Sequence, residues 1–137
     1  MTIQLTRISV LSCLSLIVLS LNTVTHAEEM PRVPAGFTIE RVTNSELTKY
    51  PMMAGFDDRG RLFIAESSGE NTRAPQLIKE PKSMIRMLED LDDDGRFDKS
   101  TVFADKLTLP MGALWHDGSL YVASPPNIWK LTDHDDD

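Results

Sequence analysis

The residues of this chain best suited to chemistry are the aspartates of the stretch DLDDDGRFD, residues 90–98. They occupy alternate positions and are followed by Gly95, which can form a sharp bend that residues with a Cβ adopt poorly. Oxygen ligands at such positions of a turning loop can converge on one calcium ion. The stretch therefore predicts a calcium site formed by the side chains of Asp90, Asp92, Asp94 and Asp98 and the backbone carbonyl of Arg96.

The loop departs from an EF-hand at its twelfth position, where Thr101 stands in place of a bidentate glutamate. The affinity expected for such a site is that of extracellular calcium modules, on the order of 10⁻⁴ to 10⁻³ M. A solvated acidic turn that binds no ion is the alternative. Four carboxylates held close together repel one another, so a bound ion would act chiefly as a staple between strands.

A second acidic run ends the chain and repeats the alternation 43 positions later, with Asp133, Asp135 and Asp137. These three residues are predicted to ligate a second calcium ion. His134 lies within the run and raises a transition-metal interpretation, but the surrounding oxygens favour calcium and a solvated histidine.

Residues 1–27 have the pattern of a secretory signal peptide. Arg7 precedes the apolar run Ile8–Leu21, and a short polar stretch ends at Ala27, after which cleavage is expected. An uncleaved anchor is the alternative for this segment. The single cysteine, Cys13, leaves with the signal peptide unless it is a lipid-attachment residue, which would be expected to end the apolar run. The sequence thus predicts an exported protein, in the periplasm, at the cell surface or outside the cell.

The remaining segment, 28–137, is acidic. The chain carries 21 Asp and Glu against 14 Lys and Arg, a formal net charge of −7. This balance argues against nucleic acid and anionic membranes as partners, because both require basic residues, and it suits cations. No membrane-spanning segment is expected beyond the signal peptide.

Short apolar runs separated by turn residues predict strands throughout this segment. No stretch shows a sustained helical period, and Ser67–Lys82, with Gly69, Pro75 and Pro81, is interpreted as a surface loop. The expected fold is an all-β meander. Its strands are predicted at Phe37–Val42, Met52–Phe56, Arg61–Ala65, Met84–Leu88, Thr101–Ala104, Ala113–Trp115, Leu120–Ala123 and Asn127–Leu131.

An internal repeat accompanies this pattern. Gly60–Ala65 matches Gly118–Ala123 at an offset of 58, and Ile85 to Asp94 matches Ile128 to Asp137 at an offset of 43. A repeat of about 40 to 45 residues with four short antiparallel strands is typical of a β-propeller blade. About two blades are present, so the segment 28–137 is expected to be an N-terminal fragment of a β-propeller domain; the alternative is a product that folds alone.

The strings GFTIERV, FDDRGRLFIAES, IRMLEDLDDDGRFDKSTVFADKLTLPMG and LYVASPPNIWKLTDHDDD resemble the start of the membrane-bound dehydrogenase domain of planctomycete-type secreted proteins. The resemblance covers about residues 33–137. It implies a β-propeller related to the glucose/sorbosone dehydrogenases, with quinone or haem chemistry in parts absent here. No residue matches the family's general base, and the haem motif C-x-x-C-H is absent.

Two function classes follow. One is an oxidoreductase of the sorbosone-dehydrogenase type, and this fragment of it is expected to be inactive alone. The other is a non-catalytic extracellular propeller that binds carbohydrate or protein. His116 is expected to be a surface turn residue rather than a base, and Glu66 with Arg73 ordinary loop charge. Inter-blade core is expected for Phe63, Trp115, Tyr121 and Trp129.

Overall fold

The computed structural model describes residues 30–134, which belong to two compact units divided between Phe37 and Thr38. In the first unit, the described residues contain one turn, in which the Phe37 N–H donates to the Pro34 carbonyl at 3.1 Å. The predicted signal peptide and two residues of the second acidic run, Asp135 and Asp137, lie outside the described residues.

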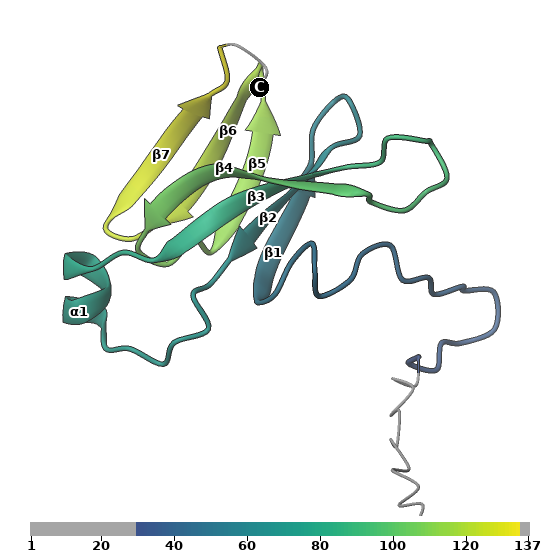
Figure 1. Cartoon of the computed structure of the whole chain (residues 1–137), viewed down its shortest axis with the longest axis horizontal. Coiled ribbons are helices and arrows are strands. Elements are labelled where there is room, and N and C mark those ends of the chain that lie inside the picture. The colour runs from purple at the N-terminus through teal and green to yellow at the C-terminus, as the bar shows by residue number, and fades with distance from the viewer. Residues whose placement is uncertain (1–29, 135–137) are drawn as a thin grey trace, which may run out of the picture. The chain divides into compact units, whose positions relative to one another are not determined.

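The second unit contains two antiparallel sheets, so the predicted all-β class is confirmed (Figure 1). The first sheet has the order β1-β2-β3-β4 and the second the order β5-β6-β7, each a simple meander. Three strands, rather than the predicted four, form the second sheet among the residues that the structure describes. The strands are β1 (Pro51–Phe56), β2 (Leu62–Glu66), β3 (Ser83–Glu89), β4 (Lys99–Leu107), β5 (Gly112–His116), β6 (Ser119–Ser124) and β7 (Asn127–Thr132).

Tight turns join the strands of both predicted hairpins. Between β1 and β2, the Asp57 carboxylate accepts the backbone N–H groups of Arg59 and Arg61, both at 2.9 Å, and Gly60 has a φ of +83°. Between β5 and β6, Asp117 and Gly118 both have positive φ, as a two-residue hairpin turn of the Asp-Gly type requires. The sequence signals for these two hairpins are therefore confirmed.

The strand predicted at Phe37–Val42 is wrong. These residues form no strand, and their apolar side chains Phe37, Ile39 and Val42 are exposed. A strand needs a neighbour that takes up its backbone groups, and the Val42 carbonyl instead accepts the N–H of Phe97 at 2.9 Å. The alternating pattern is thus present in the sequence without a partner strand in the fold.

The loop predicted over Ser67–Lys82 contains a short helix, α1 (Ala74–Lys79), which the sequence interpretation missed. Pro75 lies in its first turn, a position that tolerates a missing N–H, and Lys79 lies in its last turn. The helix buries no residue. Because the helix is so short and has no apolar face, its sequence carries no helical period from which it could be predicted.

The main core lies between the two sheets. Phe63, Ala65, Ile85 and Met87 of the first sheet pack with Leu120 and Val122 of the second. Trp115 stacks on Phe63 with ring centroids 5.5 Å apart and planes inclined by 17°. Close approach of the backbones requires Gly55, since a Cβ there would lie 2.7 Å from the Ala113 carbonyl oxygen.

The opposite face of the first sheet is covered by local segments. Leu62, Ile64 and Leu88 form a buried cluster, against which Leu47 and Phe97 pack. Leu47 precedes the strands and Phe97 belongs to the β3–β4 connection. The face is therefore closed by residues of the chain's own turns and loops.

The two sheets share one register. In the first sheet Phe63 pairs with Met87 and Leu62 with Leu88. In the second sheet Tyr121 pairs with Lys130 and Leu120 with Leu131. These pairs are related by the offsets of 58 and 43 found in the sequence, so the sequence repeat is also a repeat of strand pairing.

Candidate metal site

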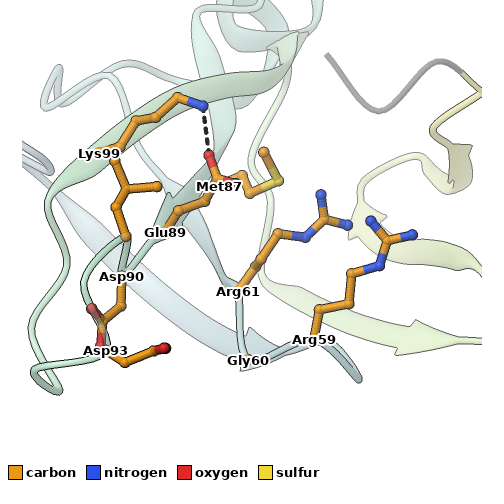
Figure 2. Close-up of a pocket in the computed structure, with 9 residues that line it drawn as sticks. Arg59, Gly60, Arg61, Met87, Glu89, Asp90, Asp93 and Lys99 are labelled. Atoms are coloured by element: carbon orange, nitrogen blue, oxygen red, sulfur yellow. Dashed lines mark hydrogen bonds and ion pairs between the residues drawn. The ribbon is translucent and has the colours of Figure 1, made fainter.

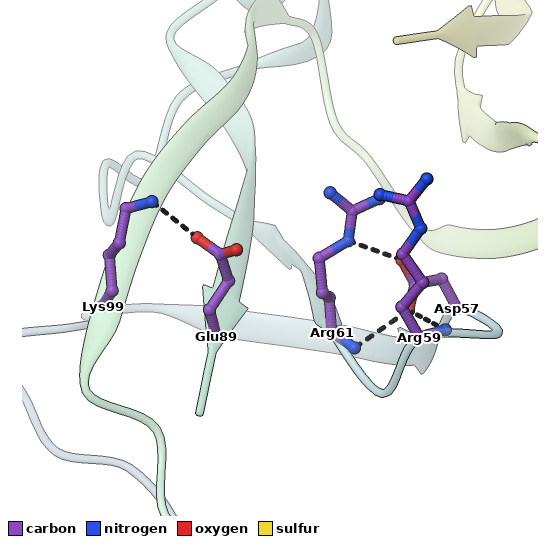
Figure 3. A network of polar contacts seen from close by, with 5 residues as sticks. All are labelled: Asp57, Arg59, Arg61, Glu89 and Lys99. Carbon is purple, nitrogen blue, oxygen red and sulfur yellow. Dashed lines mark hydrogen bonds and ion pairs between the residues drawn. The ribbon is translucent and has the colours of Figure 1, made fainter. Parts of the chain in front are cut away.

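The acidic loop connects β3 to β4, and paired residues fix both of its ends. Glu89 and Lys99 face each other in the ladder, and their side chains form an ion pair at 2.7 Å (Figure 3). The Asp98 N–H donates to the Glu89 carbonyl at 2.9 Å. The loop therefore begins and ends at paired residues of two neighbouring strands, and the chain between them turns back on itself.

Phe97 anchors the loop to the first sheet. Its side chain packs against the cluster of Leu62, Ile64 and Leu88, and its N–H is bonded to Val42. Asp93 and Gly95 have left-handed φ values of 59° and 87°, which lets the chain reverse within a few residues. This anchoring holds the flanking aspartates in defined positions.

Three predicted ligands converge. One carboxylate oxygen from each of Asp90, Asp92 and Asp98 can be chosen so that all three lie within 4.8 Å of one another. Calcium binds oxygen at 2.3–2.6 Å, so two ligands on opposite sides of one ion are separated by roughly 5 Å at most. The spacing of these oxygens is compatible with one shared cation.

The polar contacts around these carboxylates are uneven. The second oxygen of Asp90, Oδ2, accepts the Gly95 N–H at 2.8 Å, and Asp98 Oδ2 accepts the Leu91 N–H at 2.9 Å. By contrast, Asp90 Oδ1 is buried and accepts no hydrogen bond from the described residues. A buried acceptor without a partner is unfavourable by about 1 to 3 kcal/mol, and a cation would satisfy it. The residues present thus fit a hard cation.

Asp94 has a different position from the other predicted ligands. Its Oδ1 accepts the Arg96 N–H at 2.8 Å, a local turn, and Asp94 does not belong to the converging group. The structure therefore brings together three of the four predicted carboxylates of this loop. Coordination by Asp94 and by the Arg96 carbonyl stays a prediction.

The second acidic run is only partly described. Asp133 follows β7 and is half-buried, and His134 is exposed. Both border a cavity of about 670 Å³ that is also lined by Phe103 of β4 and Leu131 of β7. A second metal site stays a prediction, because Asp135 and Asp137 lie outside the described residues.

Another cavity, of about 440 Å³, lies beside the first acidic loop (Figure 2). The β1–β2 turn forms one wall of it and the β3–β4 connection the other. Its charged lining consists of Arg59, Arg61, Glu89, Asp90, Asp93 and Lys99.

The interpretation of Glu66 as loop charge is wrong. Glu66 ends β2, is 3% exposed, and accepts hydrogen bonds from Arg86 Nε at 2.7 Å and Thr48 Oγ1 at 3.0 Å. Arg73 stands at the start of α1, exposed, and takes no part in these contacts. The roles of Thr48 and Arg86 were missed, although an arginine within the apolar run of β3 is a signal for a buried acidic partner.

The aromatic residues divide between core and surface. Phe63 and Trp115 lie in the core between the sheets, as predicted. Tyr121 lies on the second sheet's other face with Lys130 Nζ 5.8 Å from its ring centroid, and Trp129 is exposed. Neither Tyr121 nor Trp129 belongs to the core between the two sheets, and their packing between blades stays a prediction. His116, at the end of β5, is exposed as expected.

The fold and the loop define an all-β protein of two antiparallel sheets with an acidic connection suited to a cation. Residues 24–137 match the family described as "Domain of unknown function (DUF7133)", and the chain belongs to this family. No curated protein and no solved structure match the chain. Within residues 30–134, no helix has the length and apolar character needed to cross a membrane.

Proposed function

We propose that this chain supplies the calcium-stapled first blades of an exported β-propeller protein of the sorbosone-dehydrogenase type. The observation that carries the calcium part is the convergence of Asp90, Asp92 and Asp98 together with the buried Asp90 Oδ1. The proposal assigns the ion a structural role, since it would link the end of β3 to the start of β4.

The charge of the loop supports a cation. Carboxylates close together favour an open loop through mutual repulsion, and a divalent ion reverses this preference. The oxygen-only ligand set favours calcium over softer metals. Binding is expected near 10⁻⁴ to 10⁻³ M, suited to extracellular calcium.

The packing of the sheets supports a propeller. The first sheet packs on the second through Phe63, Ala65, Ile85 and Met87. The repeat relates these four residues to four residues on the other face of the second sheet, which points away from the first sheet. This other face has exposed positions, including Ile128, which is 79% exposed. A further sheet of the same kind could cover this face in the same way. The equivalent residues are Tyr121, Ala123, Ile128 and Lys130.

The catalytic part of the proposal rests on the sequence resemblance. We propose that a longer protein containing this segment oxidises a sugar or aldehyde with a quinone cofactor. Further parts of the propeller would carry the catalysis, and this segment would serve as scaffold. The alternative is a non-catalytic propeller that binds carbohydrate or protein. Quinone-dependent turnover by a longer protein containing this segment would favour the first class, and glycan binding without turnover the second.

The calcium proposal is tested by titrating calcium into the whole chain and into Asp90→Asn, followed by calorimetry. We expect Asp90→Asn to weaken calcium binding about tenfold or more, because it removes the charge of the ligand with the buried oxygen. Calcium should also raise the melting temperature of the unaltered chain by mass action.

Asp93→Asn is the matched control. Asp93 carries the same charge in the same loop but does not belong to the converging group, and asparagine tolerates its left-handed φ. Calcium affinity in this variant should stay within about twofold of the original. Equal losses in both variants would show that the loop attracts cations only through its net charge, and the site would be rejected.

A further inference from the structure

The segment that precedes the strands, residues 38–48, forms neither a helix nor a strand. We call it the lead-in segment. A turn closed by Asn44 lies within it: the Asn44 Oδ1 accepts the Glu46 N–H at 2.8 Å, and the Asn44 carbonyl accepts the Thr48 N–H at 3.2 Å. Because no strand pairing holds this segment, its place on the first sheet depends on individual contacts with other elements.

Two of these contacts lead to the acidic loop. The Val42 carbonyl accepts the Phe97 N–H at 2.9 Å, and the Leu47 carbonyl accepts a hydrogen bond from Ser100 Oγ at 2.7 Å. Asp98, one of the three converging carboxylates, lies between Phe97 and Ser100 in the sequence. A predicted calcium ligand is therefore flanked on both sides by residues that hold the lead-in segment.

An apolar surface connects the same two parts of the chain. Leu47 of the lead-in segment and Phe97 of the acidic loop both pack against the buried cluster of Leu62, Ile64 and Leu88. Removal of either side chain from the cluster would expose apolar surface to water, which is unfavourable. The loop and the lead-in segment thus share a packing surface on the sheet as well as hydrogen bonds.

The far end of the lead-in segment is held in a different way. Thr48 is 7% exposed, and its Oγ1 donates to Glu66 Oε2 at 3.0 Å. Glu66 ends β2 and does not belong to the acidic loop. Thr48 therefore keeps its position whatever the loop does, and only residues 38–47 depend on the loop.

Calcium binding and the position of these residues are linked through the loop. Without an ion, repulsion between the carboxylates favours an open loop, in which Phe97 and Ser100 leave their partners in the lead-in segment. An ion that binds the closed loop stabilises every contact that requires the closed loop. Such a coupling is reciprocal, so the lead-in segment also favours binding of the ion.

We propose that calcium binding to the acidic loop holds residues 38–47 on the first sheet, so that the loop acts as a calcium-dependent clasp. This proposal rests on the calcium site proposed above. At low calcium, residues 38–47 are released from Phe97 and Ser100 while Thr48 stays bonded to Glu66. The calcium concentration around the protein then sets how readily a protease attacks this part of the chain.

The test is limited trypsin digestion of the whole chain with and without calcium, followed by mass spectrometry of the products. Trypsin cuts after Arg41 only when the surrounding residues open, so the rate reports release of the segment. We expect calcium at about ten times its dissociation constant to slow this cleavage about tenfold. Cleavage after Arg32, which is exposed and belongs to the first unit, should not change, and it also corrects for any effect of calcium on trypsin.

Two variants locate the effect. Asp90→Asn should lose the slowing at the same calcium concentration. Ser100→Ala keeps every carboxylate but removes the bond to the Leu47 carbonyl, so cleavage after Arg41 in the presence of calcium should be about fivefold faster. Ser45→Ala is the matched control, because Ser45 is an exposed serine of the same segment, and its cleavage rate should stay within about twofold of the original.

Calorimetric titration of the same samples with calcium separates the clasp from the calcium site. Calcium binding with an unchanged rate of cleavage after Arg41 would overturn the clasp and leave the calcium site intact. Absence of binding would reject the calcium site and the clasp together. The clasp would also be rejected if the bond after Arg41 resisted trypsin without calcium, if Asp90→Asn kept the slowing, or if Ser100→Ala behaved like Ser45→Ala.

Discussion

At the scale of single residues, two ion pairs of similar length lie in contrasting surroundings. Glu66 and Arg86 meet at 2.7 Å with side chains 4% and 22% exposed, and Thr48 also donates to the same carboxylate oxygen. Glu70 and Lys82 meet at 2.9 Å with both side chains about half exposed. The hydrogen bond with Glu70 raises the pKa of Lys82. The two pairs allow a direct comparison of buried and solvated charges.

Glu66→Gln should lower the free energy of unfolding by about 2 kcal/mol. The change leaves the Arg86 charge in a mostly buried position without its counterion, and the slight exposure of Arg86 reduces the penalty from that of a fully buried pair. Urea denaturation followed by circular dichroism measures the difference.

Glu70→Gln is the control for the buried pair, and it should leave the unfolding free energy nearly unchanged because water solvates both partners. Similar losses in the two variants would mean that burial of Glu66 contributes nothing special to stability.

At the scale of elements, the geometry of the candidate metal site in the acidic loop depends on the residue that anchors the loop to the sheet. Phe97 connects the loop to the cluster of Leu62, Ile64 and Leu88 on the first sheet. Its N–H donates to the Val42 carbonyl, so the segment before the strands also takes part. The positions of the carboxylates thus depend on an apolar residue between them.

Phe97→Ala should weaken calcium binding although every carboxylate remains. Loss of the packed ring frees the loop, and ordering it again on binding costs conformational entropy. We expect a loss of about tenfold in calcium affinity and of about 2 kcal/mol in unfolding free energy, since the ring is half-buried rather than fully buried. Titration calorimetry and urea denaturation measure the two effects.

Leu91→Ala tests the same loop at an apolar residue that is 65% exposed. Its calcium affinity and stability should be nearly unchanged. If Leu91→Ala weakened calcium binding as strongly as Phe97→Ala, general loop composition rather than the anchor would control the site.

Sequence reasoning worked where the signal was local. The turn residues and the alternating aspartates determine the conformation of their own segments, so the sequence predicted both hairpins. It also predicted that the carboxylates of Asp90, Asp92 and Asp98 lie close together. It failed where a distant partner decides. Phe37–Val42 has the pattern of a strand but no strand beside it, and the burial of Glu66 depends on Arg86, twenty positions away. Asp94 was assigned by spacing, and its place in a metal site stays a prediction, with one of its oxygens accepting the Arg96 N–H in the structure.

At the scale of the second unit as a whole, the two sheets meet at a backbone contact that only glycine permits. A Cβ on Gly55 of β1 would lie 2.7 Å from the Ala113 carbonyl oxygen of β5. The neighbouring atom is backbone, so relief requires the sheets to shift. The packing of Phe63 against Trp115 depends on the same separation.

Gly55→Ala should therefore destabilise the unit by about 1 to 3 kcal/mol, the range found for overpacked cores. Gly112→Ala in β5 is the control, because a Cβ there meets no atom within 4 Å, and it should be neutral or slightly stabilising. Thermal unfolding of both variants measures the difference. An unchanged melting temperature for Gly55→Ala would show that the sheets adjust freely.

The covering of the first sheet's far face by Leu47 and Phe97 gives this unit a direction. Its first sheet ends in a face closed by the chain's own residues, while its second sheet ends in a face with Ile128 exposed. The two outer faces of the unit therefore differ. A further sheet beside the second sheet would contact the side chains of its strands directly, whereas a sheet beside the first would meet Leu47 and Phe97 before it met any strand. The turn around Leu47 thus sets the surface that a last blade would contact if the sheets closed into a ring.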